Sequence, residues 1–168
     1  MIKNKSIHEV LTKISEELTE KIKYPNDGGC CVIASVVGKH LSKHVPVALR
    51  IIDYKDTSLN DIVKNTPKDA HAERVMDHFC SNNVIFNHVV IQAKLEGKNV
   101  YWDSNGTTNS LVNKKNSYTK VRKGTIPLEI GSKLAESTNW NEEFNRKQIP
   151  KIEKIVAKHF KKLDKVVM

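Results

Sequence analysis

The chain has 168 residues, of which 39% are hydrophobic and 28% charged, and its formal net charge is +9. This length suits one domain with a substantial core, and the composition excludes wholesale disorder. No apolar run approaches the roughly 20 residues that a membrane-spanning helix needs. The first residues also lack the uninterrupted apolar segment of a secretory signal. We therefore expect a single cytoplasmic domain over 1–168 that does not associate with a membrane.

The basic residues are mostly lysines spread along the chain. Lys accounts for 24 of the 28 basic residues and Arg for only four. Arg is the residue that best reads bases and grips phosphates, whereas dispersed Lys gives solubility and weak, salt-sensitive attraction to polyanions. Aromatic residues that would stack on bases are also few. We expect a solvated basic surface, with nucleic acid as the less favoured partner. The abundance of Lys and Asn is typical of proteins from AT-rich genomes, and a phage is one such source.

The first predicted element is an amphipathic helix over residues 6–22. Ser6, followed by Glu9 three residues later, matches a capping box at a helix start. Apolar residues then recur at helical spacing along this segment: Ile7, Val10, Leu11, Ile14, Leu18 and Ile22.

Turn-forming residues fill 24–29, and a second helix is predicted from about residue 30 to 42. The β-branched run 45–54 is typical of a strand. Residues 55–67 are expected to be loop, and residues 68–83 are either a helix or an ordered excursion.

The strongest strand signal is a hairpin in which 84–95 and 98–106 flank the turn residues Glu96 and Gly97. If Leu95 pairs with Lys98, then His88 and Asp103 become diagonal neighbours on one face, with Cβ atoms about 7–8 Å apart. This pairing predicts a hydrogen bond between His88 and Asp103. The other face becomes continuous and apolar, and comprises Val89, Ile91, Ala93, Leu95, Val100 and Trp102.

After the hairpin, residues 107–124 are polar and are expected to form a loop. Helices are predicted over 127–137 and 140–167. The second of these has one apolar stripe with Lys on its other faces, and we expect the stripe to pack on the core: Ile152, Ile155, Val156, Phe160 and Leu163.

Two adjacent cysteines open the second predicted helix. The free N–H groups and the dipole of a helix N-terminus stabilise a thiolate, and a nearby imidazolium adds to that effect. Cys30 shares the apolar helix face with Ala34 and Val37, so it should point toward the sheet that carries His88. Cys31 is rotated about 100° away, onto a small and polar stripe. Periodicity therefore selects Cys30 as the reactive sulfur.

The segments "GGCCVIA", "NHVVI" and "YWDSNG" resemble the papain-like superfamily, in particular its NlpC/P60-like and transglutaminase-like members, small bacterial and phage proteins among them. These families place Gly-x-Cys at a helix start, a small residue four positions later (Ala34 here), a His at the head of a strand, and an Asp or Asn on the next strand. The resemblance covers residues 26–106. It implies an α+β fold in which a Cys-bearing helix packs on a small antiparallel sheet. Helices at both ends flank this catalytic core, and the C-terminal ones close it over residues 127–165.

The resemblance implies thiol-dependent acyl transfer without a cofactor. Cys30 would attack the amide of a peptide, isopeptide or protein substrate, His88 would carry the proton, and Asp103 would orient His88. A peptidase, an amidase, a deamidase and a transglutaminase would all share this chemistry. Papain has a Gln before its Cys that helps to bind the oxyanion. Here Asn26 is the nearby amide, with Gly29 and the backbone N–H of Cys30 or Cys31 as further candidates.

Other interpretations use the same residues. The cysteines suit a core position, and Asp103 lies in the turn sequence "DSNG". A zinc site could draw on Cys30, Cys31 and Cys80 with His71 or His78, but there is no CxxC spacing, so we expect no metal. The same absence argues against a redox pair. His40 and His44 lack the Glu of HExxH and are expected at the surface. The competing function is a non-catalytic binding or structural protein whose basic surface contacts nucleic acid or a protein partner.

Overall fold

A computed structural model describes residues 2–22, 30–53, 88–110, 120–121, 126–128 and 142–167. These residues form an α+β fold. The elements in chain order are α1 (Ile2–Lys21), α2 (Cys30–Leu41), β1 (Val47–Asp53), β2 (His88–Leu95), β3 (Lys98–Asp103), β4 (Gly106–Thr108), β5 (Lys120–Val121), β6 (Ile126–Pro127) and α6 (Glu142–Val167).

The sheet is antiparallel and has the strand order β4-β3-β2-β1-β5, with β6 also paired to β1. Strand β2 is central, and its first residue, His88, lies opposite Ile52 of β1. The β2–β3 register places Leu95 opposite Lys98 and Ile91 opposite Trp102. The predicted hairpin register is therefore confirmed.

The β2–β3 turn explains why the register is fixed. Glu96 and Gly97 both have positive φ angles, 52° and 76°. Two-residue hairpin loops of this kind match the natural twist of the strands, and glycine accepts the conformation without steric cost. Because a shift of one residue would move every side chain to the opposite face, this turn decides which side of the sheet carries His88.

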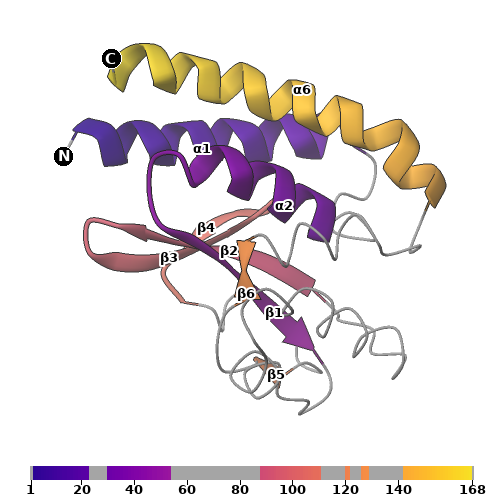
Figure 1. Ribbon diagram of the computed structural model, residues 1–168, viewed down its shortest axis with the longest axis horizontal. Coiled ribbons are helices and arrows are strands. Elements are labelled where there is room, and N and C mark those ends of the chain that lie inside the picture. Colours follow the sequence, from indigo (N-terminus) through magenta and orange to yellow (C-terminus); the bar gives the residue numbers. More distant parts are fainter. Residues whose placement is uncertain are drawn as a thin grey trace.

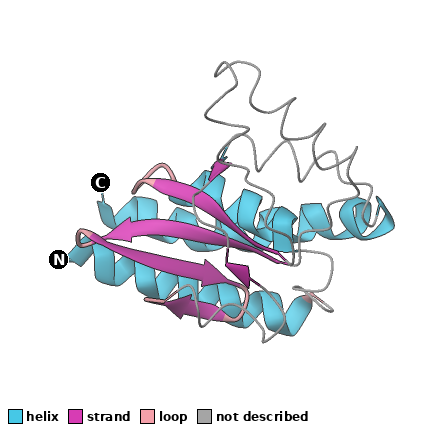
Figure 2. Ribbon diagram, turned by 90° about the horizontal axis from the view of Figure 1, so that it is seen from below, coloured by secondary structure: helices cyan, strands magenta, loops and turns pink. Residues whose placement is uncertain are grey.

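All three described helices cover the same face of the sheet (Figures 1 and 2). Helix α2 packs on β1, β2 and β3, while α1 packs against β4. Helix α6 packs on α1 and α2 and forms an outer layer, and the two chain ends lie at the same end of the molecule (Figure 1). The described part of the chain therefore has three layers: the sheet, then α1 with α2, then α6.

Helix α1 buries the predicted stripe, since Ile7, Leu11, Ile14 and Leu18 are all fully buried. Its start differs from the prediction. The helix begins at Ile2, so Ser6 lies inside it and the Ser6–Glu9 pair is not a capping box at the N-terminus. The pattern was misleading because a capping box requires a non-helical first residue, and here the preceding residues continue the helix.

Helix α2 is buried on nearly all sides, not only along the face that carries Cys30, Ala34 and Val37. Ser35 and Gly38, from the small and polar stripe, are buried as well. A Cβ atom built on Gly38 would lie 2.7 Å from Leu128 Cδ1, so the absence of a side chain permits close packing there. The reason is the third layer, because α6 covers the side of α2 that faces away from the sheet.

The C-terminal stripe packs on the core as predicted, with Ile152, Val156 and Leu163 buried. The surface location expected for His40 and His44 is wrong for His44, whose side chain is 8% exposed, while that of His40 is half-buried. Both imidazole rings stack on Phe160, with centroids 5.5 and 5.9 Å away. His40 and His44 are four residues apart, so both rings can reach the one ring of Phe160 on α6. This contact forms only when α6 packs on α2.

The segment 107–124 is not wholly a loop, because it contains most of β4 and all of β5. The chain reverses at Ser104 and Asn105, and Gly106, with a φ of 112°, then pairs with Asp103 as the first residue of β4. The helix predicted over 127–137 is wrong at its first residue, because Pro127 ends β6. The rest of that segment from residue 129, the loop expected over 55–67 and the helix or excursion expected over 68–83 lie outside the described residues.

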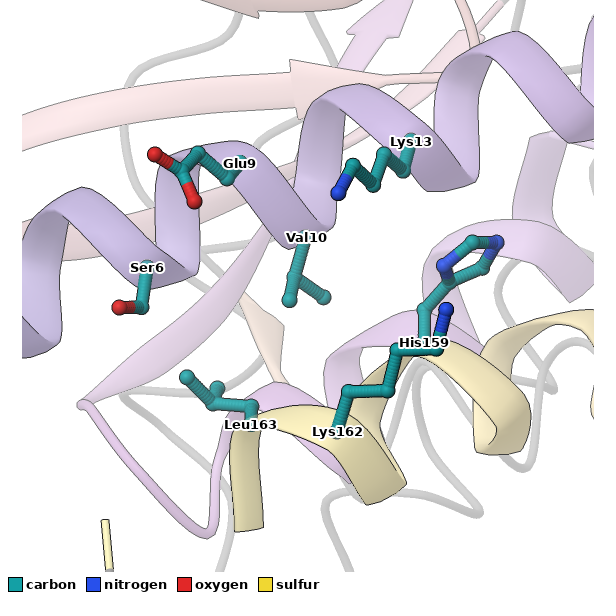
Figure 3. A pocket seen from close by; sticks show the side chains of 7 residues that line it. All are labelled: Ser6, Glu9, Val10, Lys13, His159, Lys162 and Leu163. Atoms are coloured by element: carbon teal, nitrogen blue, oxygen red, sulfur yellow. The ribbon is translucent and has the colours of Figure 1, made fainter. Parts of the chain in front are cut away.

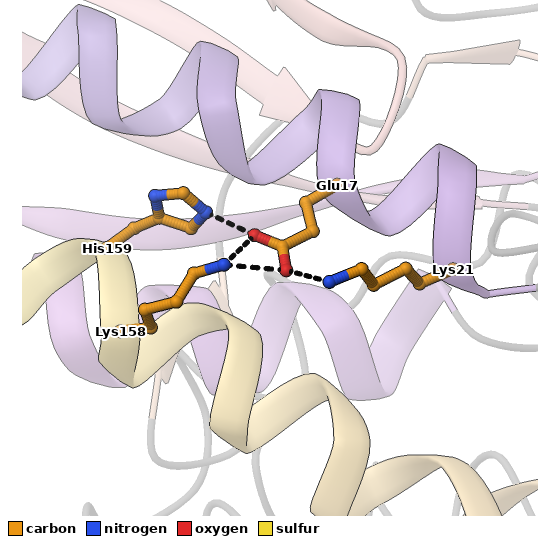
Figure 4. A network of polar contacts seen from close by, with 4 residues as sticks. All are labelled: Glu17, Lys21, Lys158 and His159. Carbon is orange, nitrogen blue, oxygen red and sulfur yellow. Dashed lines mark hydrogen bonds and ion pairs between the residues drawn. The ribbon is translucent and has the colours of Figure 1, made fainter.

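A charged cluster joins α1 to α6 (Figure 4). Glu17 of α1 accepts hydrogen bonds from Lys21 at 2.6 Å, from Lys158 at 2.7 Å and from His159 Nε2 at 2.6 Å. Chiefly because of the bonds from Lys158 and Lys21, the pKa of Glu17 falls to about 2. The ionised carboxylate therefore holds the outer helix against the middle layer.

Replacing Glu17 should weaken this attachment in a pH-dependent manner. A carboxyl group with a lowered pKa contributes stability above its unfolded value of 4.5 and loses it as the pH falls toward 2. We expect Glu17→Gln to lower the free energy of unfolding by about 1 kcal/mol at pH 7, since the lysines are half exposed. Urea unfolding at several pH values measures this. The difference should shrink between pH 4.5 and 2, and exposed Glu16→Gln serves as the control. An equal loss at both ends of that range would contradict the role of the charge.

Candidate functional site

His88 and Asp103 are in direct contact. His88 is the first residue of β2 and Asp103 the last residue of β3, so the hairpin register brings them together at one end of the sheet. His88 Nε2 lies 2.8 Å from Asp103 Oδ2, with 13% of the His88 side chain and 5% of the Asp103 side chain exposed. The hydrogen bond predicted from the register is present.

Asp103 is held on two further sides. Its second carboxylate oxygen, Oδ1, accepts a hydrogen bond from the backbone N–H of Asn105 at 2.9 Å, which closes the turn into β4. Its backbone carbonyl accepts a bond from Ser15 Oγ of α1 at 3.4 Å. The neighbouring Trp102 donates Nε1–H to the same Ser15 oxygen at 2.9 Å. The carboxylate is therefore fixed in orientation before any substrate binds.

Cys30 provides the third group. It is the first residue of α2, is a free thiol and is 2% exposed. Its thiol lies close enough to the His88 ring to help raise the pKa of that ring. Helix α2 packs on β2, and this packing places the start of the helix beside the start of the strand. The structure thus brings Cys30, His88 and Asp103 into one connected group.

The imidazole of His88 favours its charged form. Burial by itself would lower the pKa of His88, but hydrogen bonds with Asp103 and Cys30 outweigh it and raise the pKa to about 9. Because Nε2 is engaged by Asp103, the other ring nitrogen, Nδ1, is the one placed to exchange a proton with a sulfur. The arrangement can hold an imidazolium between a carboxylate and a thiolate.

The described part of the structure gives no contact between this group and the other predicted site residues. Asn26 and Gly29 lie outside the described residues. Cys31 occupies the second position of α2, where its backbone N–H belongs to the first turn, and its side chain is outside the description. The oxyanion assignments therefore stay predictions.

The zinc alternative finds no support among the side chains that can be placed. Within the described ranges there is no group of three or more His, Cys, Asp or Glu side chains suited to a metal ion. Cys80, His71 and His78 lie outside those ranges. In the same part of the chain, no helix is long and apolar enough to cross a membrane.

Sequence reasoning missed two residues near this group. Ser15 supports Asp103, and the signal was a small polar residue beside the apolar stripe of α1. Arg50 of β1 lies opposite Val90, so the alternation of strand residues puts it on the same sheet face as His88. Burial lowers the pKa of Arg50, while Tyr101 acts in the opposite direction. An arginine within the apolar run "VALRIID" was the available signal.

A separate groove of about 120 Å³ lies between α1 and α6 (Figure 3). Its walls include Val10 and Lys13 of α1 and His159 and Lys162 of α6. It is smaller than the roughly 300 Å³ of an ordinary small-molecule site. None of the three clustered residues lines it, so the groove is not part of the thiol site.

Comparison of the chain with protein families, curated proteins and solved structures finds no match.

Proposed function

We propose that the protein catalyses thiol-dependent acyl transfer, with Cys30 as nucleophile, His88 as general acid and base, and Asp103 as the residue that positions His88. The observation that carries this proposal is the position of His88, which is bonded to Asp103 at 2.8 Å and lies close enough to the thiol at the start of α2 for that thiol to help raise its pKa. A nucleophile, a proton carrier and a group that orients the carrier are the parts that covalent catalysis by a side chain requires.

The reaction follows from these positions. The Cys30 proton passes to His88, and the sulfur attacks the carbonyl carbon of an amide. His88 then delivers a proton to the nitrogen as the C–N bond breaks, which releases an amine and leaves a thioester on Cys30. Water or a second amine attacks the thioester, and His88 accepts the attacking group's proton. The C–S bond breaks, and the proton returns to the sulfur.

The order of elements supports a papain-like arrangement. A helix begins at the cysteine, the histidine begins a strand that packs beneath this helix, and the aspartate ends the next strand. The free N–H groups in the first turn of α2 would help to hold both the thiolate and the oxyanion. We propose Asn26, Gly29 and the backbone of Cys31 as the other contributors to the oxyanion site.

Peptide, isopeptide and protein amides are the proposed substrates. An assay over such a panel, with and without added amine, separates hydrolysis, deamidation and transamidation, because all three pass through the same thioester. Thiol-dependent turnover with trapping of an acyl-enzyme by intact mass spectrometry is the expected result. Absence of both turnover and alkylation of Cys30 by iodoacetamide would rule out the enzyme.

The titration of His88 gives a test that needs no substrate. A raised pKa means that the protonated ring is favoured on folding, and this contribution is complete below 6.5 and lost as the pH rises through about 9. We expect the His88 ring signals in an NMR titration to move near pH 9 in the native protein and at lower pH in Asp103→Asn. A midpoint near 6.5 in both proteins would contradict the proposed interactions.

The competing proposal is a non-catalytic protein on the same fold. The burial of Cys30, which is 2% exposed, favours it, because free cysteines are often buried in protein cores for structural reasons alone. A buried charged pair beside that sulfur argues the other way. Removing charges from water is costly, so a histidine and an aspartate are a poor choice where apolar residues would pack as well.

A further inference from the structure

The exposed face of α6 carries a row of lysines in its second half. They recur at helical spacing, and at 100° per residue they fall within an arc of about 100°. All are exposed, and together they are called the lysine stripe: Lys151, Lys154, Lys161, Lys162 and Lys165. Lys158 lies in the same arc but is bound to Glu17 of α1, so it is not counted in the stripe. At 1.5 Å per residue, the stripe extends about 21 Å along the helix.

The fold directs this stripe outward. The opposite side of α6 carries Ile152, Val156 and Leu163, which are buried against α1 and α2. The acidic residues in the same part of the helix point to its flank. Glu153 Oε2 lies 3.7 Å from His40 Nε2 of α2, and Asp164 Oδ1 lies 3.1 Å from His44 Nε2 in the turn after α2. The lysines are therefore not interleaved with acids.

Such a pattern works against the stability of the helix. Lysines that are three or four residues apart repel one another, as Lys161 and Lys165 do, whereas alternating signs would stabilise the same surface. A solvated face that only confers solubility needs no such segregation of charge. The segregation indicates a partner that supplies the opposite charge along a line.

The groove between α1 and α6 adds a recess beside the stripe (Figure 3). Lys13 and Lys162 come from its facing walls, and Glu9 lies farther along α1 beside Ser6 (Figure 3). The Nδ1 atom of His159 is buried and has no hydrogen-bond partner among the described residues. A charged oxygen at this end of the groove would contact ammonium groups of two helices.

We propose that the lysine stripe binds the phosphate backbone of double-stranded nucleic acid without reading its sequence. A duplex presents one negative charge per about 1.7 Å of its axis, which matches a straight row of cations. Lysine contacts phosphates as a point charge and reads bases poorly. The stripe holds no aromatic residue on which single-stranded bases would stack. The apolar side of α6 is buried in the core, so it cannot enter a membrane surface.

The test measures binding of a fluorescent 24-base-pair duplex by anisotropy between 50 and 200 mM salt. The variant Lys151→Gln/Lys154→Gln removes two charges from the stripe. We expect affinity about tenfold lower at 100 mM salt and a salt slope smaller by about 1.8, or 0.9 for each lost phosphate contact. The control Lys94→Gln/Lys98→Gln removes two exposed lysines from the β2–β3 hairpin, and it should bind within about twofold of the native protein.

Three results would overturn the proposal. The first is equal weakening by the two double variants, which would reflect net charge and not the stripe. The second is tighter binding of a single strand of the same length. The third is retention on phosphatidylserine vesicles without duplex binding. The inference is independent of the thiol chemistry, and Cys30→Ala should bind the duplex as the native protein does.

Discussion

Replacing Cys30 with alanine or serine should abolish both turnover and rapid alkylation near neutral pH. Cys30 is the sulfur that contacts His88, and no other group described at the start of α2 could form the thioester. Loss of a catalytic nucleophile lowers kcat by at least about 10³-fold. Peptide mapping after a brief iodoacetamide pulse gives the second readout, since it reports each cysteine separately.

Cys31→Ala is the matched control for this experiment. It changes the adjacent position of the same helix turn, one residue farther from the N-terminus, and should retain most of the turnover and the labelling of Cys30. Thermal unfolding of all three variants shows whether they fold. Folded Cys30→Ala with unchanged turnover, or rapid labelling of Cys31 in place of Cys30, would refute the assignment of the nucleophile.

Replacing Asp103 with asparagine should lower kcat by about 10²–10⁴-fold with little change in KM. The asparagine oxygen can still accept a hydrogen bond from Nε2 of His88, but it lacks the charge that helps to raise the pKa of that ring to about 9. His88→Gln should have an effect at least as large, because it removes the proton carrier itself.

A second aspartate–histidine contact serves as a control for the loss of charge. Asp164 Oδ1 lies 3.1 Å from His44 Nε2, where α6 packs, but the Asp164 side chain is 55% exposed and no hydrogen bond joins the two groups. Asp164→Asn removes a charge beside a histidine away from the thiol site, and it should leave kcat unchanged. A positioning role also requires that the alkaline limb of the pH–rate profile move to lower pH in Asp103→Asn. A loss of activity matched by a loss of folded protein, with no shift of that limb, would assign Asp103 to stability alone.

The sequence alone determined the parts that depend on neighbouring residues. The turn at Glu96 and Gly97 fixed the β2–β3 register, and that register brought His88 within reach of Asp103 without any information about the rest of the fold. The periodicity of α1 and α6 identified their buried faces for the same reason, since a helix with one apolar stripe has one way to bury it. Local signals failed at Ser6, because the helix begins at Ile2 and the capping pattern lies inside it.

Only the tertiary structure decided what lies beside what across long stretches of chain. The contact between Cys30 and His88 depends on how α2 packs on β2, and the support of Asp103 by Ser15 depends on where α1 crosses β4. Both contacts arise when the apolar faces of the helices and of the sheet are buried together, and the sequence of one segment does not specify that arrangement. The same packing set α6 as a third layer, enclosed α2, and put His40 and His44 around Phe160. The lysines of α6 were already predicted on the faces away from its apolar stripe, and docking that stripe on α1 and α2 leaves them to the solvent.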